Sequence, residues 1–155
     1  MPSSKTERDW NIGNAIAASA IAAPAAALPA SVDLRTAWWG IGDQESTGSC
    51  VGWASTDGVA RYQMVKAGKL PQDGRLSPRC TWMASKETDE FTNRPQTFIE
   101  GAGTSLKAAM EFLRKYGSVP DSLLPFHVAT AMYLGNEDTF YATAATRRIA
   151  SYFNL

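Results

Sequence analysis

The fold of this chain is decided by the stretch Asp43-Gln44-Glu45-Ser46-Thr47-Gly48-Ser49-Cys50-Val51-Gly52-Trp53-Ala54. In it, a polar loop containing glycine turns into an expected helix at the cysteine. The unpaired N–H groups and the dipole at a helix N-terminus stabilise an anion, so a thiolate is favoured over a thiol there. Because the thiolate is the nucleophilic form, Cys50 is a candidate nucleophile, and the competing interpretation is a buried, inert thiol.

Two neighbours in this loop fit a nucleophilic role for the cysteine. Gln44 lies six residues before Cys50, and its side-chain amide could reach back across the loop. Together with the backbone N–H of Cys50, that amide would form a two-donor pocket for a developing oxyanion. Gly48 would allow another backbone to approach closely beside the nucleophile.

Apolar periodicity and capping residues predict a mainly helical chain around this stretch. Four helices are expected, over about 50–66 (ended by Gly68), 78–91 (begun by Ser77), 105–115 (ended by Gly117) and 137–147. Cys80 would face the core as a small hydrophobe, and Leu106 would belong to the buried stripe of its helix. Residues 149–153 have the composition of the start of a strand.

The N-terminal residues 1–27 form an alanine-rich arm, and residues 28–155 form the domain. The arm is expected to hold a helix that begins at Asp9, ends at Pro24 and packs on the domain. A secretory signal is the alternative interpretation, but the acidic Glu7 and Asp9 cancel the basic residues that such a signal needs.

Composition excludes several classes of function. The chain has 155 residues, enough for one domain, and 15 basic residues balance 15 acidic ones, which argues against a nucleic-acid partner or a polybasic membrane anchor. No run reaches the roughly 18 apolar residues of a membrane span. Two cysteines and one histidine are too few for a disulfide scaffold or a usual zinc site, so no metal and no cofactor are expected. The low cysteine content favours a cytoplasmic location, with secretion as the alternative.

Residues 28–155 resemble papain-like cysteine peptidases, which carry a glutamine and then a Gly-Ser-Cys at the start of a long central helix. Here the matching residues are Gln44 and Gly48-Ser49-Cys50. Further segments that resemble the family are the entry segment Leu28 to Arg35, the pair Gly101 and Gly103 before a helix, and the stretch from Tyr116 to Phe126. The resemblance implies an α+β papain-like fold, of which this chain would be the helical left domain.

The resemblance also implies roles for individual residues. Cys50 would attack the scissile carbonyl and Gln44 would stabilise the oxyanion. Gly48, Gly101 and Gly103 would lie along the substrate, with the glycine strip hydrogen-bonding the peptide backbone. Two departures are Val51, where most plant and animal members have tryptophan, and the absence of the cysteine that usually precedes the nucleophile.

The largest departure is length. In the family, the catalytic histidine and asparagine follow the cysteine by roughly 130 to 150 residues. This chain of 155 residues ends 105 residues after Cys50, so the resemblance implies that it is truncated and lacks both residues and the β-rich right half. His127, 77 residues after Cys50, is expected on the outside of the helical half, and a role as substitute base is the less favoured interpretation.

The sequence therefore predicts a fragment of a cysteine peptidase that acts on peptides or proteins. The alternative is a non-catalytic binding or inhibitory module derived from such a peptidase. A thiol redox protein is a weaker alternative, because no Cys-x-x-Cys pair is present. Without the right half, Trp38 and Trp53 would face water, so association with the missing half or with a second copy is expected.

Overall fold

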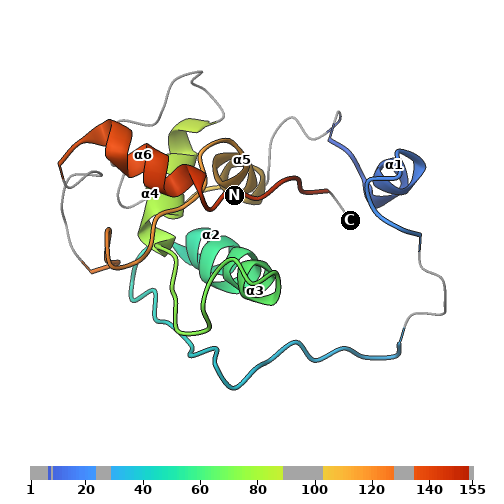
Figure 1. Cartoon of the computed structure of the whole chain (residues 1–155), viewed down its shortest axis with the longest axis horizontal. Helices are drawn as coiled ribbons and strands as arrows, with labels where there is room; N and C mark the ends of the chain where they lie inside the picture. Colours follow the sequence, from blue (N-terminus) through green and yellow to red (C-terminus); the bar gives the residue numbers. More distant parts are fainter. Residues whose placement is uncertain (1–6, 8, 24–28, 89–102, 128–134, 154–155) are drawn as a thin grey trace.

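A computed structural model describes residues 7, 9–23, 29–88, 103–127 and 135–153. Its centre is one continuous helical run over 50–66, made of α2 (Cys50–Trp53), the π-helical segment η1 (Ala54–Ala60) and α3 (Arg61–Lys66) (Figure 1). Gly68 ends the run with φ of +67°, and the N–H of Lys69 donates to the carbonyl of Met64 at 2.8 Å. This is the helix that the sequence predicts, although the π-helical middle was not expected.

The helices α4 (Pro78–Thr88) and α5 (Leu106–Lys115) pack against each other and against the central run. Both begin at the predicted serine. Ser77 Oγ accepts from the N–H of Cys80 at 3.0 Å, and Ser105 Oγ accepts from the N–H of Ala108 at 3.1 Å. Gly52 lets α2 meet α4 closely, since a Cβ there would lie 2.6 Å from the Cβ of Trp82.

The helix α6 (Glu137–Ala145) covers the pair α4 and α5 (Figure 1). It is capped by Asn136, whose Oδ1 accepts from the N–H of Thr139 at 3.0 Å. The main core cluster joins these three helices and the loop after α5; its buried members are Cys80, Ala84, Phe112, Val119, Leu124, Phe140, Tyr141 and Ala144. The packing at Gly117 is tight, because its φ is +83° and a Cβ would lie 2.0 Å from the carbonyl oxygen of Ala144.

The predicted N-terminal helix is wrong in both of its ends. The helix α1 (Ile12–Ala17) is capped by Asn11, whose side chain accepts from the N–H of Asn14, and not by Asp9. The carboxylate of Asp9 instead pairs with Lys107 Nζ of α5 at 2.8 Å. The helix ends at Ala18, well before Pro24, because Ser19 adopts a left-handed φ of +56°.

The predicted strand at 149–153 is also wrong. This segment lies along α5, where the N–H of Ile149 donates to the carbonyl of Leu113 at 3.2 Å. Over the described ranges the only β pairing is a single antiparallel bridge between Leu76 and Pro120. The β component of the expected α+β fold is therefore not found in the part of the chain that the structure describes.

The entry segment 29–41 follows an extended path without regular structure to the start of the central run (Figure 1). Trp38 and Trp39 are half-buried, because both stack with Tyr62 of α3, at 6.3 and 6.0 Å between ring centroids. Trp53 is also half-buried, so the expectation that the tryptophans face water is wrong. The exposed apolar side chains are smaller ones: Val32, Leu34, Ile41, Val59 and, against expectation, Leu106. None of the helices in the described ranges is long and apolar enough to cross a bilayer.

Candidate active site

Cys50 is exposed at the first residue of the central helical run. The residue before it, Ser49, is fully buried and fixes the helix start, since its carbonyl accepts from the N–H of Trp53 at 3.0 Å. No side chain caps this N-terminus, so the first backbone N–H groups point into the space around the Cys50 side chain. The interpretation of Cys50 as a buried thiol is therefore wrong, and its role as nucleophile stays a prediction.

The loop that leads to the cysteine is closed by its own hydrogen bonds. The side-chain amide of Gln44 donates to the carbonyl of Thr47 at 3.1 Å, and the hydroxyl of Thr47 donates to the carbonyl of Gln44 at 2.6 Å. The hydroxyls of Thr47 and Ser49 lie 2.6 Å apart, which ties the loop to the helix start. The amide of Gln44 has two hydrogens, and its bond to Thr47 uses one of them.

The residue after Gln44 has an unusual backbone conformation. Glu45 adopts a left-handed φ of +52°, which a residue with a side chain rarely does. The N–H of Glu45 donates to Oδ1 of Asp43 at 2.7 Å, and its carboxylate lies 3.1 Å from Nδ1 of His127. The surroundings thus hold the backbone in a state that costs about 1 kcal/mol.

The structure brings two of the three predicted substrate-binding glycines together. A Cβ on Gly103 would lie 3.7 Å from the carbonyl oxygen of Gly48, so the two backbones are in contact distance beside the cysteine loop. Thr104 fixes this segment, since its hydroxyl accepts from the buried hydroxyl of Ser85 in α4 at 3.0 Å. Gly101 lies outside the described residues.

His127 is on the surface, as predicted, with a side chain that is 64% exposed. What the sequence did not indicate is that it reaches the loop containing Gln44. Two other residues near this loop were assigned only to the core: Trp53, and Phe126, whose ring lies 5.1 Å from that of Trp53. Their link to the loop involves residues far apart in sequence, and no local pattern could have indicated it.

Cys80 has the inert role that the sequence predicts. It is fully buried in the main core cluster, and burial raises the pKa of its thiol to about 12. Hydrogen bonds at Val119 and Ser118 oppose this shift but are smaller than the cost of burial. Both cysteines are free, so no disulfide masks Cys50.

A buried charged cluster lies below the site on the central run. Asp57, almost fully buried, accepts from Arg61 at 3.0 Å and from Arg75 at 3.2 Å. The second amino group of Arg61 donates to the carbonyl of Gln72 at 3.0 Å. The spacing of four residues between Asp57 and Arg61 was the available sequence signal for this pair. The cluster fixes the segment 72–75 to the helix that carries Cys50. Nearby, burial raises the pKa of Asp121.

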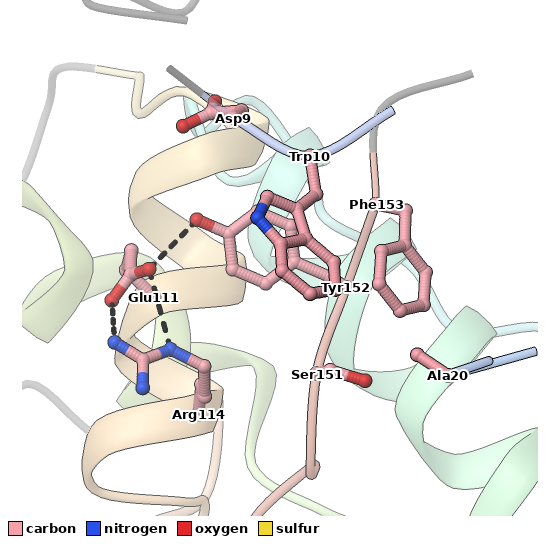
Figure 2. Close-up of a pocket in the computed structure, with 8 residues that line it drawn as sticks. All are labelled: Asp9, Trp10, Ala20, Glu111, Arg114, Ser151, Tyr152 and Phe153. Carbon is pink, nitrogen blue, oxygen red and sulfur yellow. Dashed lines mark hydrogen bonds and ion pairs between the residues drawn. The ribbon is translucent and has the colours of Figure 1, made fainter. Parts of the chain in front are cut away.

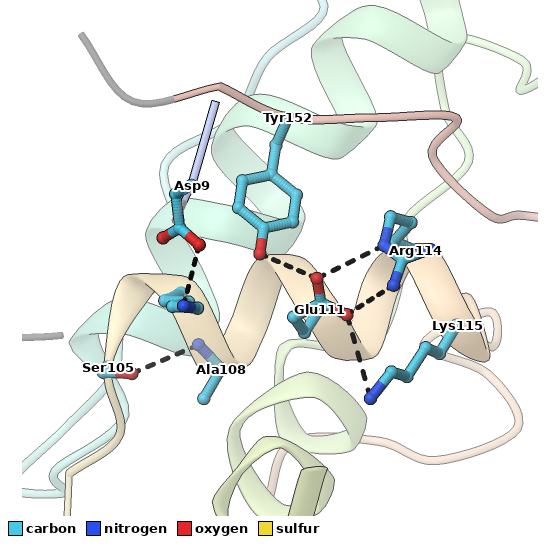
Figure 3. Close-up of polar contacts among 8 residues, drawn as sticks. Asp9, Ser105, Ala108, Glu111, Arg114, Lys115 and Tyr152 are labelled. Atoms are coloured by element: carbon cyan, nitrogen blue, oxygen red, sulfur yellow. Dashed lines mark hydrogen bonds and ion pairs between the residues drawn. The ribbon is translucent and has the colours of Figure 1, made fainter. Parts of the chain in front are cut away.

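A pocket of about 440 Å³ lies elsewhere, between α5 and the two terminal segments (Figure 2). Trp10 stacks on Phe153 across it, with ring centroids 6.4 Å apart. Its polar wall is Glu111, which accepts from the hydroxyl of Tyr152 at 2.8 Å and from Arg114 at 2.7 Å (Figure 3). Burial alone would raise the pKa of Glu111, but these bonds outweigh it and lower that pKa. None of the predicted site residues lines this pocket.

Comparisons with known proteins give one informative result. No protein-family model matches the sequence, and no curated protein matches it. A solved structure does match: xylellain, a cysteine protease from Xylella fastidiosa, with a TM-score of 0.67 and 19% sequence identity. The likeness covers 99% of this chain and 56% of xylellain, so the chain spans little more than half the length of that protein. The described chain therefore has the fold of part of a cysteine protease.

Proposed function

We propose that this chain is the nucleophile-bearing helical half of a papain-type cysteine peptidase. The observation that carries the proposal is the exposed Cys50 at the first turn of the central helix, with the Gln44 loop on one side and Gly103 on the other. The shared fold with a cysteine protease supports it. The substrate class is a peptide or protein, and no cofactor takes part.

The proposed reaction uses these residues as follows. The sulfur of Cys50 attacks the scissile carbonyl carbon and forms a C–S bond, while the carbonyl oxygen takes up the negative charge. The backbone N–H of Cys50 and the amide of Gln44 donate to that oxyanion, and Gly103 aligns the peptide backbone. Collapse of the intermediate breaks the C–N bond, and the amine leaves with a proton. Water then hydrolyses the thioester.

The proton for the leaving amine needs a general acid, which in this class of enzyme is an imidazole. His127 is not the assigned group, because it pairs with Glu45 on the surface. We propose that the histidine and asparagine come from the β-rich half, which has no counterpart in this chain. The chain alone would then bind peptides and react at Cys50 but cleave peptide bonds very slowly.

A peptide aldehyde tests the proposal without the missing half. The thiol adds across the aldehyde carbonyl to give a hemithioacetal, in which sulfur is bound to carbon and the thiol proton is on oxygen. We expect a Cys50 adduct by mass spectrometry, weakened on the order of 100-fold in Gln44→Ala, because an oxyanion donor typically contributes that much. Alkylation of Cys50 by iodoacetamide forms no oxyanion and should keep its rate in Gln44→Ala.

Cys50→Ser is the control for adduct formation at the intended residue. Equal adduct stability in the wild type and Gln44→Ala would contradict the assigned oxyanion pocket. The alternative of a non-catalytic binding module is favoured by one observation, the exposed Val32, Leu34 and Ile41 on the entry segment. That function predicts peptide binding that is unchanged in Cys50→Ser and no hemithioacetal in the wild type.

A further inference from the structure

We propose that Trp53 and the pair Phe126–His127 form a clamp that positions the loop carrying Gln44. The inference rests on the proposed function, since it gives a positioning role to residues that would act only through Gln44. The clamp consists of five residues in contact: Gly42, Trp53, Phe126, His127 and Glu45. Two of them flank Gln44 in the sequence, and three lie on or beside the helices that support it.

The first contact fixes the loop before Gln44. A Cβ on Gly42 would lie 2.0 Å from Cζ3 and 2.5 Å from Cη2 of Trp53, so the backbone of Gly42 rests directly on the six-membered ring. Only glycine allows this approach, since any other side chain would displace the ring or the loop. The indole N–H of Trp53 is buried and has no hydrogen-bond partner among the described residues, so packing alone determines the position of the ring.

The second contact anchors the ring to the body of the molecule. Phe126, only 5% exposed, packs edge-on against Trp53 at 5.1 Å and against Trp82 of α4 at 6.2 Å. The carbonyl of Phe126 accepts from the buried Arg79 of α4 at 2.9 Å. The guanidinium of Arg75 lies 5.9 Å from the Trp53 ring centroid. Trp53 therefore has a fixed position against which the loop can be placed.

The third contact fixes the loop after Gln44. His127 follows the anchored Phe126, and its Nδ1 lies 3.1 Å from the carboxylate of Glu45, the residue in the left-handed conformation. Strained backbone of this kind persists only where the surroundings hold it, and it concentrates at functional sites. Both side chains are more than half exposed, so the pair contributes little energy, and the contact of Gly42 with Trp53 is the stronger part of the clamp.

The chain offers a matched pair of variants for a test. In Gly42→Ala the new methyl meets the Trp53 ring, whereas in Gly40→Ala it meets nothing within 4 Å. Two measurements are made on the whole chain: NMR order parameters of the backbone N–H groups of residues 43–47, and the dissociation constant of the peptide aldehyde adduct. Iodoacetamide alkylation of Cys50 reports on the nucleophile itself, and circular dichroism reports on folding.

For Gly42→Ala we expect lower order parameters in the loop and an adduct weakened at least 10-fold, with an alkylation rate within 2-fold of the wild type. Gly40→Ala should match the wild type in all of these. Trp53→Phe removes the ring atoms that touch Gly42 without breaking a hydrogen bond, so it should loosen the loop. The double variant Gly42→Ala with Trp53→Phe should then be less impaired than the two separate effects combined. His127→Ala should weaken the adduct only 2- to 5-fold.

Unchanged order parameters in Gly42→Ala and Trp53→Phe would overturn the clamp, whatever the adduct does. A wild type that forms no adduct would overturn the proposed function, while the order parameters would still decide whether the clamp exists. If Gly42→Ala and Gly40→Ala weakened the adduct equally, the contact with Trp53 would not be its cause and the clamp would be rejected.

Discussion

At the scale of single residues, the two cysteines have opposite environments. Cys50 is exposed at a helix start and Cys80 is enclosed by the core. The sequence allowed this distinction, because Cys50 follows a loop and Cys80 lies on the apolar face of a predicted helix. It could not indicate that Glu45 would adopt a left-handed backbone or that His127 would lie beside it. Those two residues are 82 positions apart, and only the folded chain brings them together.

Burial of Cys80 should make the stability of the protein depend on alkaline pH. The pKa of its thiol is raised from 9.0 to about 12 in the folded state. Below pH 9 both states hold the proton, and between pH 9 and 12 the unfolded state loses it first, so stability falls as pH rises. We expect urea denaturation to show about 2 kcal/mol of extra loss between pH 8 and pH 10.5, since one pKa unit corresponds to about 1.4 kcal/mol.

Cys80→Ala supplies the comparison for that experiment. It should lower stability at every pH but lack the extra alkaline loss, because it has no thiol to ionise. Parallel pH profiles for the two proteins would show that Cys80 is not buried as described. Tyrosine ionisation affects both proteins equally and cancels in the difference.

At the scale of elements, the helices were predictable where their caps are local. Ser77 and Ser105 accept from backbone N–H groups three residues away, and Gly68 and Gly117 end their helices with positive φ. The start of α1 was not predictable, because Asp9 and Asn11 are both capping residues. A contact 98 residues away, to Lys107, decides between them. The false strand at 149–153 has the same cause, since strand pairing depends on distant partners and here α5 takes that place.

The charged cluster on the central run should matter more than a surface pair of the same type. In Asp57→Asn the buried Arg61 loses its carboxylate, and removal of one partner from a buried pair costs about 3 kcal/mol or more. Asp33→Asn is the matched control, because its pair with Arg35 is exposed and should change stability little. Chemical denaturation of the three proteins measures the difference. Equal midpoints for the two variants would contradict the structural role assigned to Asp57.

At the scale of the whole molecule, the central run has an uncovered apolar side. Val59 on η1 is 53% exposed, and Ile41 on the entry segment is fully exposed. Gly58, next to Val59, lies near the ring of Trp39, so helix and entry segment meet on this side. The spared tryptophans reduce this surface relative to expectation but do not remove it. Exposed apolar area of this kind is covered in most proteins by another domain or chain.

We therefore expect the isolated chain to associate with itself as its concentration rises. Sedimentation velocity should show an increasing mass, and Val59→Ser should shift the equilibrium toward the monomer. Leu106→Ser is the matched control, since Leu106 is 55% exposed but lies on α5. A monomer at all concentrations, or an equal effect of both substitutions, would remove the support for a covering partner on this side.

The π-helical segment between Cys50 and α3 sets the direction in which the sulfur faces. A π turn holds one residue more than an α turn, so everything before η1 is rotated about the helix axis relative to an unbroken α-helix. One residue corresponds to about 100° of rotation. A homologous helix that lost a single residue within 54–60 would keep its contacts at α3 but aim its cysteine toward a different neighbour. The length of this short segment is thus as specific a requirement as the identity of the nucleophile.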